Sequence, residues 1–223
     1  MTAHAGPERP WLVSYFCGDP YYAHAAAALR ARCEALGIPI LIEPAPDGGA
    51  YWRNTLLKPA FILEKLVALH RDLIWIDADT TLHEDHPEFR ALTADLTVAS
   101  HTGDLTGVKA SPIGFSCGPR SLAFLAAWAL ACQARLDAGE VDLDHDILKY
   151  EILPDFAGRL SLRLMGDPTR PRDFTEGRTL TNGLSRRARE ALPYVLARNR
   201  QRSARFAVLR LEHFALALPE PTD

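Results

Sequence analysis

The stretch RDLIWIDADTTLHED, residues 71–85, decides the fold. Its apolar run ends at Ile76, and the carboxylates of Asp77 and Asp79 follow one residue apart. Side chains at positions i and i+2 of an extended chain point to the same side. Both carboxylates therefore face one small volume at the end of a buried strand, which is costly unless a cation or a proton lies between them. The pattern indicates a site that holds a cation or a shared proton.

The segments before this stretch alternate between strand and helix patterns. Apolar runs predict strands at residues 11–16, 38–43 and 72–76, and the segments between them predict helices at 21–37 and 57–70. Strands that alternate with helices predict a parallel sheet with helices on both faces. The two aspartates would then lie at the carboxyl end of the third strand, which is where open α/β sheets bind their ligands.

The second half of the chain is predicted to continue this α/β pattern. The expected elements are strands at 95–100, 160–165 and 205–211 and helices at 121–136 and 184–198. The sequence contains no internal repeat, low-complexity tract or linker. We therefore expect a single α/β domain over residues 1–223, with a mostly parallel, Rossmann-like central sheet.

The composition is ordinary for a soluble globular protein. The chain has 223 residues, of which 48% are hydrophobic and 24% charged, and its net charge is −3. It contains neither a run of about 18 apolar residues nor the pattern of a signal peptide, so we expect no membrane span and a cytoplasmic location. The cysteines are scattered without a C-x-x-C pair, which favours reduced, structural thiols. They are Cys17, Cys33, Cys117 and Cys132.

One region is strongly basic. Residues 170–212 contain 11 Arg and 4 acidic residues, a local surplus of seven positive charges. Such a surplus suits an anionic ligand, and it is also typical of a solvated basic helix. Aromatic residues are sparse within it, so we expect no nucleic-acid partner.

The D-x-D pattern has several interpretations. Two carboxylates can hold a divalent metal that bridges a nucleotide diphosphate. They can be a nucleophile and an acid, or a dyad that shares one proton. An isolated D-x-D can also be a turn-forming Asp followed by a surface Asp. The neighbouring sequence decides among these readings.

The chain resembles the GT-A glycosyltransferases, in particular the nucleotide-diphospho-sugar transferase and glycogenin-like branches. Two segments carry the first part of the resemblance: NTLLKPAFILEKL (54–66), in which Lys-Pro opens a helix, and DLIWIDADTTL (72–82), in which a strand ends in D-x-D. Two later segments, SPIGFSCGPRSLAFLAAWALAC (111–132) and DLDHDILKYEI (142–152), match more loosely. The resemblance covers roughly residues 11–153.

The resemblance implies transfer of a sugar from a nucleotide-diphosphate sugar, most often a UDP-sugar, to an acceptor with the help of Mn²⁺ or Mg²⁺. Asp79 would be the main metal ligand, and Asp77 would contact the metal or the ribose. The loop from Phe16 to Tyr21 would hold the base and the ribose. Lys58 would approach the nucleotide or pair with a carboxylate at the strand ends, and both alternatives stay open.

Other family positions are matched less closely. Asp144 and Asp146 match a D-Q-D stretch and are candidate catalytic residues, while His145 stands beside the substrate where the family usually has Gln. The alternative for these residues is an acidic helix N-terminus that favours the helix dipole. A third metal ligand would be Asn182 or His213.

Two further functions compete with sugar transfer. The stretch also resembles the first motif of haloacid dehalogenase-type phosphatases, in which Asp77 would be the nucleophile, Asp79 the general acid or base and Asp167 a Mg²⁺ ligand. Two β-α units precede the motif here, whereas that family opens with it, and the Lys-Pro helix has no role there. A non-catalytic nucleotide-binding domain is the second alternative. His83 and His86 are expected to cap a turn rather than to bind metal.

Overall fold

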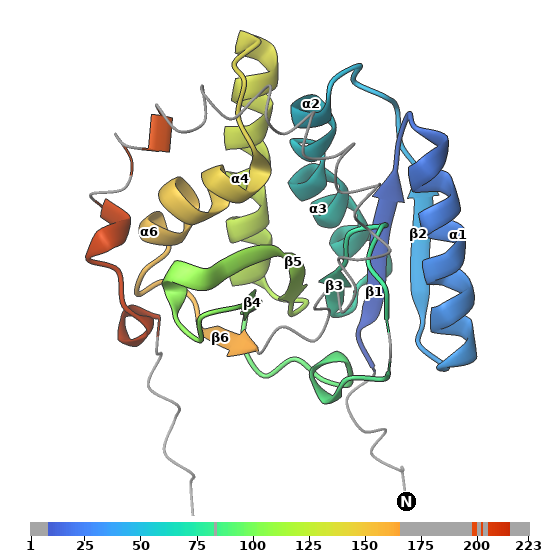
Figure 1. Ribbon diagram of the computed structural model, residues 1–223. Coiled ribbons are helices and arrows are strands. Elements are labelled where there is room, and N and C mark those ends of the chain that lie inside the picture. Colours follow the sequence, from blue (N-terminus) through green and yellow to red (C-terminus); the bar gives the residue numbers. More distant parts are fainter. Residues whose placement is uncertain (1–8, 83, 166–197, 200–201, 203–204, 215–223) are drawn as a thin grey trace, which may run out of the picture.

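The protein is described here from a computed structural model, which covers residues 9–82, 84–165, 198–199, 202 and 205–214. Six strands form a sheet with the order β2-β1-β3-β5-β4-β6. Strand β1 pairs in parallel with β2 and β3, and β4 pairs in parallel with β6, whereas β5 runs antiparallel to both β3 and β4. The prediction of an α/β fold with a mostly parallel, Rossmann-like sheet is confirmed (Figure 1).

The elements follow the predicted alternation over most of the described chain. The strands are β1 (Trp11–Phe16), β2 (Ile40–Pro44), β3 (Leu73–Trp75), β4 (Leu96–Ser100), β5 (Val108–Phe115) and β6 (Leu162–Met165). The helices are α1 (Pro20–Ala35), α2 (Tyr51–Thr55), α3 (Lys58–Leu69), α4 (Pro119–Ala138), α5 (Asp144–Ile147) and α6 (Leu153–Asp155). Shorter turns are η1 (Pro87–Phe89), η2 (Leu105–Gly107), the π-helical η3 (Leu148–Ile152) and η4 (Leu211–His213).

Local sequence signals set the ends of the long helices. Helix α1 begins after Asp19, whose side chain accepts a hydrogen bond from the Tyr21 N–H at 3.0 Å. Helix α3 ends at His70 and α4 at Gly139, and both residues adopt the left-handed conformation that commonly terminates a helix.

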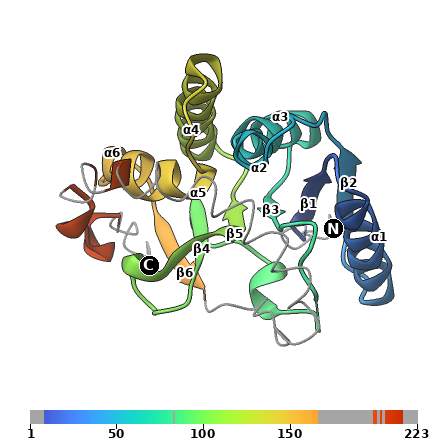
Figure 2. The same cartoon turned by 45° about the horizontal axis from the view of Figure 1, so that its top comes forward.

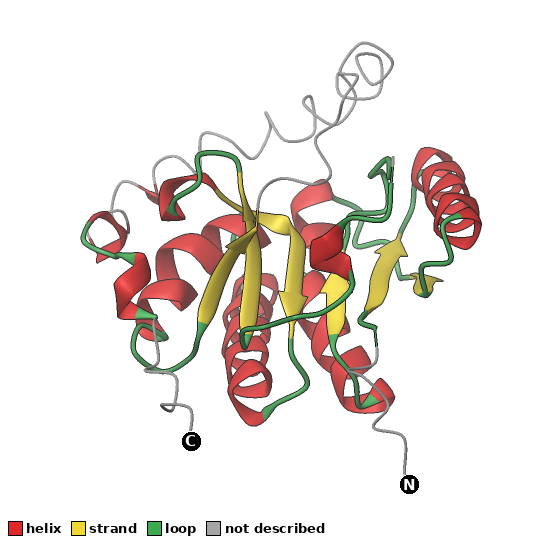
Figure 3. Cartoon of the chain, turned by 90° about the horizontal axis from the view of Figure 1, so that it is seen from below, coloured by secondary structure: helices red, strands yellow, loops and turns green. Residues whose placement is uncertain are grey.

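The sheet is covered on both faces, as alternation of side chains along its strands requires. Leu12 and Ile74 point to the face that α1 covers, while Val13 and Trp75 point to the face that α3 and α4 cover. The strands accordingly lie between helices in Figure 3, and α3 and α4 lie side by side in Figures 1 and 2. This arrangement places the loops that follow β1 and β3 at one edge of the sheet.

Strand β5 was not predicted, because Pro112 and Gly114 lie within it and both weaken strand patterns. Its pairing explains why the proline is tolerated. The pairing with β3 ends at Ile113, and the register against β4 shifts between Val98 and Ser100. Pro112 therefore lies at an irregularity, where a missing N–H costs the sheet little.

The strand predicted at residues 205–211 is wrong. Residues 205–207 are helical. Phe206 and Leu209, three positions apart, are buried in the core, whereas Val208 and Leu211 are exposed. Helical spacing and not alternation therefore explains the apolar residues of this segment. The helix predicted at 184–198 lies outside the described residues except for its last position, which is helical.

Within the described residues, no helix combines the length and the apolar composition that crossing a bilayer requires.

Candidate functional site

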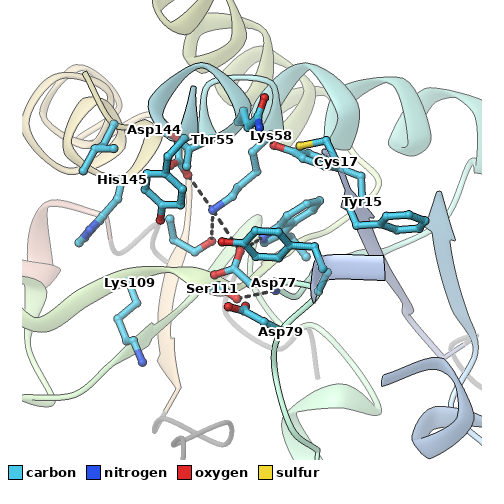
Figure 4. A pocket seen from close by; sticks show the side chains of 18 residues that line it. Tyr15, Cys17, Thr55, Lys58, Asp77, Asp79, Lys109, Ser111, Asp144 and His145 are labelled. Carbon is cyan, nitrogen blue, oxygen red and sulfur yellow. Dashed lines mark hydrogen bonds and ion pairs between the residues drawn. The ribbon is translucent and has the colours of Figure 1, made fainter. Parts of the chain in front are cut away.

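A pocket of about 330 Å³ opens at the carboxyl ends of β1 and β3. Ligand sites of α/β sheets occupy this edge, and the volume lies in the range of small-molecule sites. Its walls come from the loop after β1, helices α2 and α3, the end of β3, the start of β5 and the start of α5 (Figure 4). The lining residues include Phe16, Lys58, Asp77, Asp79, Asp144 and His145 of the predicted site.

Asp77 is directed into the pocket by two fixed contacts. Its backbone N–H donates to Ser111 Oγ on β5 at 2.9 Å, and its Oδ1 accepts a hydrogen bond from Trp75 Nε1 at 2.8 Å. Trp75 is buried at the end of β3, whereas the Asp77 side chain is 44% exposed. The carboxylate is thus oriented by the sheet and reachable from the pocket.

Lys58 lies at the centre of the polar cluster. Its Nζ lies 2.7 Å from Asp144 Oδ2, 3.3 Å from Asp77 Oδ1 and 3.5 Å from the Ala110 carbonyl oxygen, which accepts a hydrogen bond from it. Burial alone would lower the pKa of Lys58, but the charges of Asp144 and Asp77 outweigh burial and raise it well above its ordinary value. Lys58 is therefore a permanent cation with three acceptors. Of its two sequence interpretations, the structure shows the pairing with carboxylates.

The position of Lys58 in its helix is unusual. It is the first residue of α3, where the helix dipole disfavours a positive charge. It is also 94% buried, since only 6% of its surface is exposed. The carboxylates of Asp77 and Asp144 offset both the cost of burial and the cost of the unfavourable helix dipole. Lys58 is therefore held by the polar groups of the pocket and not by its helix.

Asp79 lies close to Asp77 below Lys58 (Figure 4). Burial, together with the neighbouring negative charge of Asp77, raises the pKa of Asp79 to about 6. A carboxylate in such surroundings is stabilised in its ionised form by an added cation. An added cation would therefore reduce the cost of placing Asp77 and Asp79 close together at the end of a buried strand.

The cluster carries a net negative charge that a divalent cation would balance. Asp77, Asp79 and Asp144 carry three negative charges when ionised, and Lys58 returns one positive charge, so the cluster carries −2. Lys109 also lines the pocket, but its side chain extends away from the cluster (Figure 4). Carboxylate oxygens are the donors that Mg²⁺ and Mn²⁺ prefer, so Asp77 and Asp79 fit such an ion chemically.

The protein supplies few ligands for a metal at this place. Within the ranges that the structure describes, no group of three or more His, Cys, Asp or Glu side chains is arranged to hold a metal ion. Mg²⁺ in nucleotide sites is commonly held by one or two carboxylates together with substrate phosphates. Two aspartates are therefore sufficient only for an ion that a ligand helps to bind.

Aromatic side chains form one wall of the pocket, next to the acids. Tyr15, Phe16, Tyr22 and Tyr51 line the pocket, and the rings of Tyr15 and Trp75 lie 5.0 Å apart. The Tyr15 hydroxyl donates to the Asn54 carbonyl oxygen, which ties β1 to α2. Apolar rings at this wall can stack on a flat ligand group.

The loop after β1 is shaped by a close approach. Gly18 has a φ of +70°, and a Cβ atom there would lie 2.4 Å from Asp47 Oδ2. Only glycine fits this turn, which brings the loops after β1 and β2 together at the mouth of the pocket.

The two later pocket residues are held by fixed contacts. The Asp144 backbone oxygen accepts a hydrogen bond from Trp128 Nε1 at 3.0 Å, and its side chain is buried against Lys58. His145 Nε2 donates to the Val108 carbonyl oxygen at 2.8 Å, which joins α5 to β5. Asp144 is thus the nearer of the two ion-pair partners of Lys58.

Other predicted site residues lie outside the pocket lining. Tyr22 lines the pocket in place of Tyr21, whose pKa is raised by burial and by the charge of Asp79. Asp146 faces the carboxyl-terminal segment, where Asn199 Nδ2 donates to its Oδ1 at 3.0 Å, so this position gives no support to a catalytic role.

Of the other residues considered in the sequence, two lie within the described part of the chain. His213 accepts the Arg210 backbone N–H at 3.1 Å within η4 and does not line the pocket. His86 caps η1 by accepting the Glu88 N–H, as predicted. His83, Asp167 and Asn182 lie outside the described residues.

Sequence reasoning missed several pocket residues. Tyr51, Asn54 and Thr55 lie on α2, a helix that the sequence patterns did not predict, and Lys109 and Ser111 lie on the unpredicted β5. The polar residues around α2 were the available signal. Their approach to the D-x-D pair is a tertiary feature that no local pattern encodes.

The chain is similar in fold to the solved structure of a glycosyltransferase involved in the glycosylation of the major capsid of PBCV-1. The TM-score is 0.54 at 12% sequence identity, over 72% of this chain and 82% of that one. No protein-family model and no curated protein sequence matches the chain. At this identity the likeness concerns the fold.

Proposed function

We propose that the protein transfers a sugar from a nucleoside-diphosphate sugar to an acceptor, with Mn²⁺ or Mg²⁺ held by Asp77 and Asp79. The observation that carries the proposal is the net charge of −2 at the carboxyl end of β3, in a pocket of a glycosyltransferase-like fold. A divalent ion would neutralise charge on the departing diphosphate, which stabilises the leaving group.

The residues around the acids have separate tasks in this proposal. Lys58 holds Asp77 and Asp144 in fixed positions, because its Nζ contacts both. Trp75 orients the same oxygen of Asp77 through its indole N–H. The carboxylates are therefore in place before a ligand binds, so little free energy is lost in ordering them.

The aromatic wall favours a nucleoside over a simple phosphate ester. Phe16, Tyr22 and Tyr51 offer apolar surface next to a charged cluster. A nucleotide has the matching two parts, a flat base and a charged diphosphate. A UDP-sugar is the proposed donor. The acceptor would enter on the side of His145 and Lys109, away from the aromatic wall.

The alternatives receive less support. A phosphatase of the alternative type opens its core domain with the nucleophile motif, whereas here β1, α1, β2 and α3 all precede Asp77. The structural neighbour is a glycosyltransferase, which favours neither the phosphatase nor a non-catalytic domain.

A thermal-shift panel tests the proposal. UDP-, GDP- and CDP-sugars are added with and without Mn²⁺, since a ligand that binds only the folded state raises its apparent stability. We expect a metal-dependent rise with UDP-sugars that is lost in Asp79→Ala. The control is Asp137→Ala, which removes an exposed aspartate of α4 and should keep the full response. A response without Mn²⁺, or one that survives in Asp79→Ala, contradicts the metal assignment.

A further inference from the structure

A second buried acid lies two residues before Asp144. Asp142 has no exposed surface, and its Oδ2 contacts three guanidinium groups. These come from Arg202 at 2.7 Å, Arg198 at 3.0 Å and Arg135 at 3.3 Å. Asp142 does not line the pocket, and the proposed transfer reaction gives it no direct role.

The arginines form a balanced network with three acids. Arg202 contacts Glu151 at 3.1 Å as well as Asp142, and Arg135 contacts Glu151 at 2.9 Å. Arg198 and Arg135 also contact Glu140, at 2.8 and 3.5 Å. Three cations and three carboxylates thus join the end of α4, the π-helical η3 and the carboxyl-terminal segment.

Residues 142–144 connect the ion-pair network to the pocket. Asp142 Oδ1 accepts the N–H of Leu143 at 2.9 Å, and Leu143 lines the pocket beside Asp144. Asp144 in turn is held at two points, by the Trp128 indole on its backbone oxygen and by Lys58 on its carboxylate. Residues 142–144 therefore form a short bridge whose far end is fixed by arginines.

We propose that Asp142, anchored by Arg202 and Arg135, is a positioning residue that holds Asp144 against Lys58. Arg202, which lies near the carboxyl end of the chain and does not line the pocket, would then contribute to the site through Asp142. This inference rests on the proposed function for its kinetic part only. Displacement of Asp144 would weaken the shorter of the two ion pairs of Lys58, 2.7 Å to Asp144 against 3.3 Å to Asp77, and so change the electrostatic field in the pocket.

Arg202→Gln tests the proposal, and the matched control is Arg205→Gln. Arg205 also pairs with an aspartate, Asp155, but that pair is exposed and lies away from the bridge. The first readout is the indole ¹⁵N–¹H resonance of Trp128, because its N–H binds the Asp144 backbone directly. We expect this resonance to move in Arg202→Gln and to stay in place in Arg205→Gln.

The second readout is kinetic. In Arg202→Gln we expect kcat for metal-dependent UDP-sugar hydrolysis to fall about tenfold to a hundredfold, with KM within about threefold of the wild type. A network that serves stability alone would lower the melting temperature and leave both readouts unchanged in the folded variant. Should Arg202→Gln not fold, Arg202→Lys replaces it, since lysine keeps the charge but loses the fork that reaches Asp142 and Glu151 together.

The outcomes separate the two proposals. A Trp128 resonance that stays in place overturns the positioning role, and so does a moved resonance with unchanged kcat in a wild type that turns over. A wild type that hydrolyses no sugar nucleotide contradicts the proposed function, while the Trp128 resonance still decides whether Arg202 positions Asp144.

Discussion

The indole Nε1 of Trp75 donates to Oδ1 of Asp77 across 2.8 Å, and both residues belong to the same strand end. The buried ring thus reports directly on a carboxylate that faces the pocket. Four tryptophans occur in the chain, so their indole resonances can be assigned one by one.

The first prediction uses this contact to locate the metal. Paramagnetic Mn²⁺ added with UDP should broaden the Trp75 indole resonance, because an ion on Asp77 would lie within a few ångströms of that N–H. Trp11 is the internal control, since it begins β1 and pairs with Leu73 at the amino end of β3, away from the strand end that precedes Asp77. Equal broadening of the two signals would argue against a site at Asp77.

The second prediction concerns the buried cation. Lys58→Met leaves the buried carboxylate of Asp144 without its cation, so we expect the free energy of unfolding to fall by about 3–5 kcal/mol. In the double variant Lys58→Met/Asp144→Leu a large part of this loss should be recovered, because no charge is then left unpaired. Chemical denaturation measures both.

A lysine of the same helix provides the control for that experiment. Lys65 pairs with Glu43 and Glu64, which are both partly or largely exposed. Lys65→Met should change the free energy of unfolding by only about 0–1 kcal/mol. Equal losses of unfolding free energy in Lys58→Met and Lys65→Met would show that the buried ion pairs of Lys58 stabilise the fold no more than the exposed ion pairs of Lys65.

The third prediction concerns the pH dependence of stability in EDTA. The pKa of Asp79 is about 6 in the folded protein against 3.8 when unperturbed. As the pH rises, Asp79 therefore loses its proton at a higher pH in the folded protein than in the unfolded chain. Stability is therefore lost between pH 4 and 6, by about 3 kcal/mol at most. Asp79→Asn removes this penalty and should be more stable than the wild type at pH 7.5.

The same comparison at lower pH checks the cause. Near pH 4 Asp79 is protonated in the folded state, and the advantage of Asp79→Asn should disappear. Asp137→Asn, at an exposed position of α4, should show no such dependence. An advantage of Asp79→Asn that is constant with pH would point to packing and not to charge.

The fourth prediction separates transfer from phosphatase chemistry. A glycosyltransferase forms no phosphorylated enzyme, whereas a phosphatase of the alternative type forms an aspartyl phosphate on Asp77. We expect slow metal-dependent hydrolysis of a sugar nucleotide and no phosphorylated aspartate by mass spectrometry. Capture of an aspartyl phosphate at Asp77, with turnover of small phosphate esters, would reverse the assignment.

The parts of the fold that the sequence predicted are those with local periodicity. Strand β1, helix α3 and the end of β3 carry apolar runs and helix-opening residues that act over a few positions. Two-residue alternation does not explain why Asp77 and Asp79 lie close together, because β3 ends at Trp75 and residues 78 and 79 form a turn, in which the Thr80 N–H donates to the Asp77 carbonyl oxygen at 3.0 Å. The common edge of the two aspartates with Lys58 followed from the position of helix α3 before β3 in the chain.

The parts that were missed depend on distant partners. Strand β5 contains Pro112, whose cost is removed only by the register shift against β4. Phe206 and Leu209 suggested a strand because their segment is apolar, yet the core that receives them belongs to other elements. The network around Asp142 joins residues about 60 positions apart, Asp142 and Arg202 among them.

The antiparallel direction of β5 brings the beginning of this strand to the pocket. Lys109, Ala110 and Ser111 form one wall as part of the strand, and the Ala110 carbonyl oxygen accepts a hydrogen bond from Lys58. Another wall comes from the end of β1, the loop that follows it and helix α2. A change in the length of the loop after β1 would therefore reshape that wall and leave the contact between Lys58 and β5 in place.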